Sequence, residues 1–321
     1  MKLLHIGFTV CLSTSGFSIA QSSIDAYPDY FLGKNGWVVS KQDYTEIVRF
    51  RDVKSDWPQA HFDFMSKVVK SLEGKGIKVI IAVIPQRLNV YPQMLPKDLY
   101  LSFTKDKTSY ENLMPEIRLR GMHTADLLNA ITRSPYYSSD AATYFRFEAH
   151  WNFYGAYAGA GEVYRQIKQT FGDLKLPMKK YELKILEPVP RKDTYWLSNL
   201  PKDVQPTVHP DYDVPYTLTL TSDQSALLGD DIPAVTIVGT SFTGYGFRQS
   251  LMYYLKADIL DASLPGKGMW TPMAQYIKSD AYNKTHPKLI VWEMPEYILE
   301  NYPMPTDDEY KIFSSILGIS K

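Results

Sequence analysis

The amino-acid sequence predicts an α/β protein in which a mainly parallel sheet is covered by helices on both faces. Three nearly continuous apolar runs rich in β-branched residues, at 78–84, 233–238 and 287–292, indicate buried strands. Segments with helical periodicity precede the first run, at 60–72, and lie between the first and second runs, after residue 152. Strands that are apolar on both sides need helices on both faces of their sheet. Such sheets bind their ligands at the carboxyl ends of the strands.

The elements follow one another with clear boundaries. The helix expected at 60–72 is ended by Gly74, and the next strand is closed by Pro85. A further helix is expected at 126–132, and a longer one begins after Asn152, a favourable N-cap residue. This alternation of strand and helix predicts one α/β domain over most of the chain.

One stretch, from about 175 to 232, departs from this pattern. It is rich in Pro, Asp and Tyr, shows little helical periodicity and contains strand-like pieces such as 216–221. We expect a β-rich insertion that leaves the sheet and forms either a surface hairpin or one wall of a cleft.

Composition excludes some classes of function. The 321 residues carry 35 basic and 35 acidic side chains, so the formal net charge is zero. Without a basic block, a nucleic-acid partner is not expected. The spacings that mark metal sites are missing from the sequence, so neither a metal nor a cofactor is expected.

The N-terminus has the pattern of a secretory signal peptide over residues 1–20. A short positive start is followed by an apolar, Ser/Thr-rich core, and Ser18 and Ala20 place small residues before the expected cleavage. Cleavage there would remove Cys11, which is the only cysteine in the chain. The sequence therefore predicts a periplasmic mature protein, residues 21–321, without disulfides.

A candidate nucleophile follows the second buried strand. The strand at 233–238 runs directly into Gly239-Thr240-Ser241, and a segment with helical periodicity follows. Ser241 is thus expected at the carboxyl edge of the sheet, where backbone N–H groups can stabilise an oxyanion. A serine hydroxyl also needs a base within hydrogen-bond reach. The alternative is that Ser241 only caps the helix.

His150 is the candidate base, with Glu148 two positions before it. On an extended segment this spacing places both side chains on one face, so the carboxylate can orient the ring. A structural role for His150 is the alternative, and His123, which precedes a helix, is the reserve base. The sequence by itself leaves both choices open.

Four segments resemble those of the alginate O-acetyltransferase family of the AlgJ and AlgX type. They are Phe31-Leu-Gly-Lys-Asn-Gly-Trp37, Val83-Ile-Pro-Gln-Arg-Leu-Asn-Val-Tyr-Pro92, His150-Trp151 with Gly155-Ala156, and Lys288-Leu-Ile-Val-Trp-Glu-Met-Pro-Glu296. Together with Gly-Thr-Ser they keep the order of the family's motifs over about residues 28–300.

The resemblance implies an SGNH-hydrolase-like, flavodoxin-like α/β/α sandwich whose catalytic triad has its serine last in the chain. Ser241 would be the nucleophile, His150 the base and Glu148 the acid, although the family has Asp at the last position; Asp140 is the substitute acid. A C-terminal carbohydrate-binding module is not expected. Further candidates for the oxyanion hole or substrate cleft are Gly239, Thr240, Tyr245, Arg248, Arg87 and Trp151.

The function implied is periplasmic transfer of an acetyl group, through a serine acyl-enzyme, onto an alginate-like exopolysaccharide. The resemblance also implies a membrane acyl-carrier partner and an export complex. Two alternatives remain: a secreted carbohydrate acetylesterase with the same triad, and a non-catalytic scaffold protein of an export complex.

Overall fold

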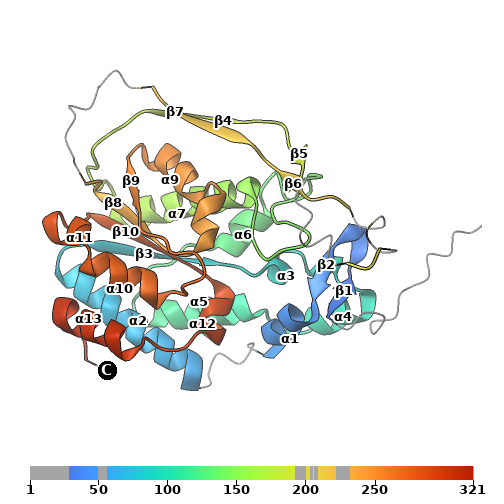
Figure 1. Ribbon diagram of the computed structural model, residues 1–321, viewed down its shortest axis with the longest axis horizontal. Helices are drawn as coiled ribbons and strands as arrows, with labels where there is room; N and C mark the ends of the chain where they lie inside the picture. Colours follow the sequence, from blue (N-terminus) through green and yellow to red (C-terminus); the bar gives the residue numbers. More distant parts are fainter. Residues whose placement is uncertain are drawn as a thin grey trace, which may run out of the picture.

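A four-stranded parallel sheet forms the centre of the computed structural model (Figure 1). Its strands, in spatial order, are β3 (Lys78–Ile84), β10 (Leu289–Pro295), β8 (Val235–Val238) and β9 (Ile259–Asp261). The last strand of the chain, β10, therefore lies between β3 and β8. The carboxyl ends of these neighbouring strands meet at one edge of the sheet.

The structure describes residues 29–49, 56–191, 200–202, 205, 209–221 and 232–320. The signal peptide expected at residues 1–20, with Cys11, lies outside the described residues. Among the described residues, no helix combines the length and apolar character that crossing a bilayer requires.

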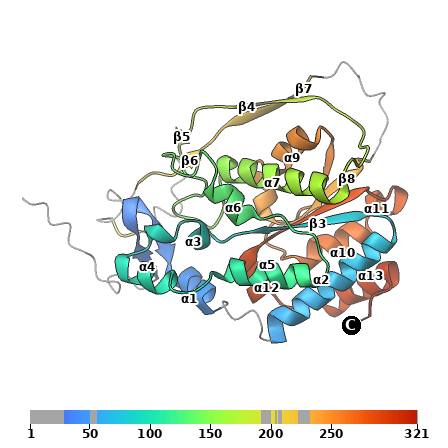
Figure 2. The same ribbon diagram turned by 180° about the vertical axis from the view of Figure 1, so that it is seen from behind.

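Helices cover both faces of the sheet, as the apolar strands predict. The first face carries α2 (Asp56–Gly74), α5 (Ser109–Leu119), α10 (Trp270–Lys278), α11 (Asp280–Lys284), α12 (Glu296–Asn301) and α13 (Asp307–Leu317). The second carries α6 (Leu127–Thr132), α7 (Phe153–Phe171) and α9 (Phe247–Leu255), which are seen best from behind (Figure 2). Neighbouring residues of β3 enter different cores: Ile81 belongs to the first and Ile80 to the second. This layering confirms the predicted fold class.

The expected elements agree closely with the observed ones. The strand predicted at 78–84 is β3, and the helix predicted at 60–72 lies within α2. Asn152 caps α7 as expected, since its side-chain oxygen accepts hydrogen bonds from the backbone N–H groups of Tyr154 (3.0 Å) and Gly155 (3.4 Å).

A smaller unit packs beside the carboxyl edge of the sheet. It consists of the hairpin β1 (Tyr30–Leu32) and β2 (Val38–Ser40), with α1 (Lys41–Arg49), α3 (Arg87–Val90) and α4 (Lys97–Phe103). Phe31, Val39, Ile47 and Phe103 form its own apolar cluster. Figure 1 shows this unit at one end of the molecule.

The stretch from 175 to 232 contains two antiparallel strand pairs outside the main sheet. One pairs β4 (Tyr181–Ile185) with β7 (Tyr216–Leu220), and the other pairs β5 (Val189–Pro190) with β6 (Tyr212–Asp213). The first pair crosses over α7 and α9 (Figure 1), where Tyr216 stacks on Phe153 with 4.2 Å between ring centroids. The second pair brings Arg191, the residue after β5, toward the carboxyl edge of the sheet.

Candidate active site

Ser241 lies where β8 gives way to a turn at the carboxyl edge of the sheet. A short 3-10 turn (Ser241–Tyr245) begins at this serine, with Thr240 as its N-cap. Helix α9 follows from Phe247. The position is the one that the strand-Gly-Thr-Ser pattern predicts.

Three side chains predicted from distant parts of the sequence meet here. His150 Nε2 lies 2.8 Å from Ser241 Oγ, and His150 Nδ1 lies 3.2 Å from Glu148 Oε2. Both distances are those of hydrogen bonds. The histidine side chain is 22% exposed and that of Glu148 13%, so the three groups form a partly buried chain with a route to solvent. This is the geometry in which a serine hydroxyl can pass its proton to an imidazole that is oriented by a carboxylate.

The segment that carries Glu148 and His150 is a closed loop and not the extended strand that the sequence argument assumed. The backbone N–H of Phe145 donates to the carbonyl of His150 (3.1 Å), and Tyr144 and Trp151 form an isolated antiparallel bridge. The loop between these points turns back on itself and brings the two side chains together. The side chains of Glu148 and His150 do meet, and the loop closure is the reason.

Aromatic rings hold the imidazole in place. The His150 ring lies 4.4 Å from the Phe242 ring and 4.7 Å from the Tyr245 ring, measured between centroids. Tyr245 therefore lies beside the His150 ring. Trp151, in contrast, is fully buried, and its indole N–H donates to the Phe242 carbonyl (2.9 Å). Trp151 thus fixes the backbone next to Ser241 and does not face a substrate.

Arg191 is a member of the site that the sequence argument missed. Its guanidinium donates a hydrogen bond to Glu148 Oε1, the carboxylate oxygen that does not contact His150. It also lies 4.3 Å from the Phe145 ring centroid and 3.7 Å from a carboxylate oxygen of Asp213. The side chains of Arg191, Glu148, His150 and Ser241 therefore form one continuous polar chain.

This chain favours an ionised Glu148. Burial by itself would raise the pKa of the Glu148 carboxyl, but the hydrogen bonds from His150 and Arg191, together with their charges, outweigh it and lower the pKa. An ionised carboxylate can accept the Nδ1–H of an imidazole and can stabilise the imidazolium that forms when a serine transfers its proton to that ring.

A second buried acid, Glu293 of β10, fixes the backbone before Ser241. Its carboxylate accepts the backbone N–H of Thr240 (2.6 Å), the Thr240 hydroxyl (3.0 Å) and the Thr243 hydroxyl (2.9 Å). A Cβ at Gly239 would lie 2.3 Å from Glu293 Oε2, so only glycine fits there. Gly239 and Thr240 therefore shape the turn, and the Thr240 N–H is already used. A lone carboxyl within an apolar strand was the available sequence signal for Glu293.

Glu293 makes stability depend on pH. It is fully buried, and burial raises the pKa of its carboxyl from 4.5 to about 7. Between these values the folded protein binds more protons than the unfolded chain, so a contribution of about 3 kcal/mol is present below pH 4.5 and is lost as pH rises through 7. Wild type should lose this contribution as pH rises, whereas Glu293→Gln has no carboxyl to titrate. We therefore expect the melting temperature of the variant minus that of wild type, measured by calorimetry, to increase from pH 5 to pH 8. Parallel curves for the two proteins would contradict this.

Other candidates lie apart from the reacting atoms. Arg248 Nε donates to the Ile259 carbonyl (2.9 Å), which ties α9 to β9 instead of placing the cation at the cleft. Arg87 is buried and donates to the carbonyls of Val38 (2.9 Å) and Arg146 (2.6 Å). Its role in the structure is to join the β1–β2 hairpin to the loop that carries the histidine.

The reserve residues are not in the polar chain. His123 packs edge-on against Phe171, with 5.2 Å between ring centroids. Asp140 contributes its backbone carbonyl to Arg146, whereas Glu148 is the acid that contacts the His150 ring. Within the part of the chain that the structure describes, His, Cys, Asp and Glu side chains do not gather in groups of three that could hold a metal ion.

Residues 31–296 match the family model described as SGNH hydrolase-like domain, acetyltransferase AlgX. The chain is 25% identical over 296 residues to the probable alginate O-acetylase AlgJ of Pseudomonas aeruginosa, covering 87% of this chain and 72% of that protein. It is 28% identical over 256 residues to the alginate biosynthesis protein AlgX of Azotobacter vinelandii, covering 77% of this chain but only 51% of that protein.

Two solved structures have a similar fold. The O-acetyltransferase domain of Pseudomonas putida AlgJ superposes with a TM-score of 0.68 at 20% identity, covering 90% of this chain and 100% of that domain. Pseudomonas aeruginosa AlgX superposes with a TM-score of 0.70 at 21% identity, covering 93% of this chain and 71% of that protein.

Proposed function

Because this chain belongs to the family of SGNH hydrolase-like acetyltransferase domains of the AlgX type, we propose that it O-acetylates an alginate-like bacterial exopolysaccharide through an acyl-enzyme on Ser241. Family membership makes it an O-acetyltransferase. The polymer, the covalent intermediate and the roles of individual residues are the proposal.

One observation carries the residue assignment: His150 bridges Ser241 Oγ, at 2.8 Å, and Glu148 Oε2, at 3.2 Å. The three side chains come from a loop and a strand end 91 residues apart in the sequence. A histidine that served only in packing would have no need of a serine hydroxyl on one nitrogen and a carboxylate on the other.

The proposed reaction has two steps. In the first, the Ser241 hydroxyl gives its proton to His150 Nε2 while its oxygen forms a bond to the acetyl carbonyl carbon of the donor. The bond to the donor's leaving group breaks, and that group takes the proton from His150. In the second, a sugar hydroxyl gives its proton to His150 and attacks the acetyl ester, and Ser241 recovers a proton as it leaves.

Location and partners belong to the same proposal. The signal-peptide pattern at residues 1–20 supports export to the periplasm. An acetyl group must then come from a donor that is accessible outside the cytoplasm. We therefore propose a membrane acyl-carrier partner and association with a polysaccharide export complex.

The transferase and esterase functions are separated by the acceptor of the second step. We expect purified protein given 4-nitrophenyl acetate and an unacetylated mannuronate oligosaccharide to form oligosaccharide acetyl esters, detected by mass spectrometry. Nitrophenol release should increase with oligosaccharide concentration if loss of the acetyl group limits the rate. Hydrolysis that the sugar does not change, without ester formation, would assign an acetylesterase instead.

A further inference from the structure

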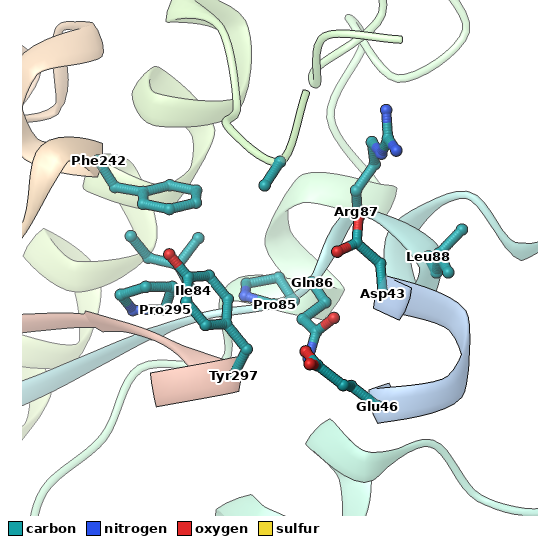
Figure 3. A pocket seen from close by; sticks show the side chains of 11 residues that line it. Asp43, Glu46, Ile84, Pro85, Gln86, Arg87, Leu88, Phe242, Pro295 and Tyr297 are labelled. Atoms are coloured by element: carbon teal, nitrogen blue, oxygen red, sulfur yellow. The ribbon is translucent and has the colours of Figure 1, made fainter. Parts of the chain in front are cut away.

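A small cavity lies next to the candidate active site, and Figure 3 shows the residues that line it. Its volume is about 260 Å³. Among the residues that line it are Ala149 and Phe242, the chain neighbours of His150 and Ser241. Ligand cavities usually measure roughly 300 to 1,000 Å³, so this one has the size for a single small unit of a larger molecule.

The walls of the cavity differ in character. Phe242, Tyr297 and Pro295 line one side in Figure 3, and the carboxylates of Asp43 and Glu46 lie on the other. Both acids come from α1, three residues apart, and therefore lie on the same face of that helix. The result is a flat apolar surface opposite two hydrogen-bond acceptors.

A buried carboxyl joins two of the chain segments that line the cavity. Glu296 is fully buried between Pro295 and Tyr297, and its Oε2 accepts the backbone N–H of Gln86 (2.9 Å) and a proton from Asn89 Nδ2 (2.9 Å). This links the segment after β10 to the segment after β3, and both segments contribute residues to the lining.

The charge of the lining is negative. The lining residues include two carboxylates, those of Asp43 and Glu46, and one guanidinium, that of Arg87, which gives a net charge of minus one. Arg87 donates to the carbonyls of Val38 and Arg146 as described above, so much of its donor capacity is used by the protein. A carboxylate entering the cavity would meet two like charges, whereas a hydroxyl group could donate to Asp43 or to Glu46, whose Oε1 also accepts a hydrogen bond from Gln42 Nε2 (2.8 Å).

We propose that this cavity is an acceptor subsite that takes one sugar unit by its hydroxyl face. Ring hydroxyls donate to Asp43 and Glu46, and the apolar face of the ring packs against Phe242 and Tyr297. Any carboxylate that the sugar carries points out of the cavity. This inference rests on the proposed function, because it gives the place where the acetyl-accepting polymer is held.

The two acids act in binding and not in the chemical step. Neither belongs to the chain of Ser241, His150, Glu148 and Arg191. Their removal should therefore raise the KM for the acceptor and leave the acceptor-independent hydrolysis of 4-nitrophenyl acetate unchanged.

The test compares wild type with Asp43→Asn, Glu46→Gln and the double variant, with Asp98→Asn on the exposed face of α4 as the matched control. Acetyl transfer from 4-nitrophenyl acetate is measured with two acceptors of equal length, a neutral β-1,4-glucan oligosaccharide and a mannuronate oligosaccharide. For the double variant we expect the KM of the neutral acceptor to rise at least roughly tenfold, since hydrogen bonds to charged groups are lost. The KM of the mannuronate acceptor should rise less, because a repulsion is removed at the same time.

The outcomes separate this inference from the proposed function. An unchanged KM for both acceptors, with normal hydrolysis of 4-nitrophenyl acetate, overturns the subsite and leaves the triad intact. If wild type does not hydrolyse 4-nitrophenyl acetate at all, the proposed function is overturned instead. If the double variant does not fold, the single variants carry the test. If no transfer is detected with either acceptor, saturation-transfer NMR measures binding of the neutral sugar to wild type and the variants. Binding that is weaker in Asp43→Asn than in wild type supports the subsite. Equal binding in all proteins, or no binding, overturns it.

Discussion

Ser241→Ala is expected to lose acetyl transfer by at least about a thousandfold in kcat, because the acyl-enzyme can no longer form. The hydroxyl is 2.8 Å from His150 Nε2, and alanine leaves that nitrogen without the proton donor on which the first step depends. The serine begins the 3-10 turn at the carboxyl edge of the sheet and is not part of the apolar core, so the variant should still fold. Initial rates with 4-nitrophenyl acetate and oligosaccharide, with circular dichroism as a check on folding, measure the effect.

Ser102→Ala, an exposed serine on α4, is the matched control and should behave like wild type. Mass spectrometry adds a direct readout: wild type incubated with donor and no acceptor should gain one acetyl group on the peptide that contains Ser241, and the variant should not. Equal polymer acetylation by wild type and Ser241→Ala would refute the catalytic assignment and favour the scaffold alternative.

The fold was accessible from the sequence because the central strands are buried on both faces. The run 78–84 is apolar without interruption from residue 79 onward, which favours a strand buried on both faces of a sheet. Strand β3 has these bounds. The position of Ser241 could be predicted for a related reason. Gly239-Thr240-Ser241 follows a buried strand directly, and strand ends meet at one edge of a parallel sheet.

The partners of the site were harder to find because their pairing depends on tertiary structure. Arg191 lies in the insertion, 43 residues from Glu148, in a stretch without periodicity that would reveal its direction. Glu293 was visible as a charged residue in an apolar strand, but its three partners around Thr240 lie 50 or more residues away. Sequence patterns report the burial of an element; they do not report which polar groups meet there.

The glutamate at position 148, where the resemblance leads one to expect aspartate, fits the site because both of its oxygens are used. One accepts from the imidazole and the other from Arg191, so the longer side chain is held at both oxygens. A glutamate without this second partner would have more rotamers available and would lose more side-chain entropy to orient the ring. The guanidinium therefore compensates for the additional methylene.

Arg191→Met is accordingly expected to reduce kcat by roughly ten- to a hundredfold, with little change in the KM for the acceptor. The substitution removes a charge-assisted hydrogen bond to Glu148 Oε1 and keeps an unbranched side chain of similar length against Phe145. It also removes a positive charge that lowers the pKa of Glu148. The carboxyl would then take up a proton at higher pH than in wild type, so activity should begin to fall at a higher pH on the acidic side. Rates from pH 4 to pH 8 measure both effects.

Two further variants distinguish positioning from mere packing. Arg191→Lys keeps the charge and should recover part of kcat and most of the pH profile, whereas Asp213→Asn should change little, because that carboxylate is 3.7 Å from Arg191 and 53% exposed. A purely structural role for Arg191 would lower the melting temperature but leave the pH profile of the folded enzyme in place. An Arg191→Met protein with wild-type kcat and an unmoved acidic limb would show that Glu148 is held without the guanidinium, and the fourth member of the polar chain would have no part in the reaction.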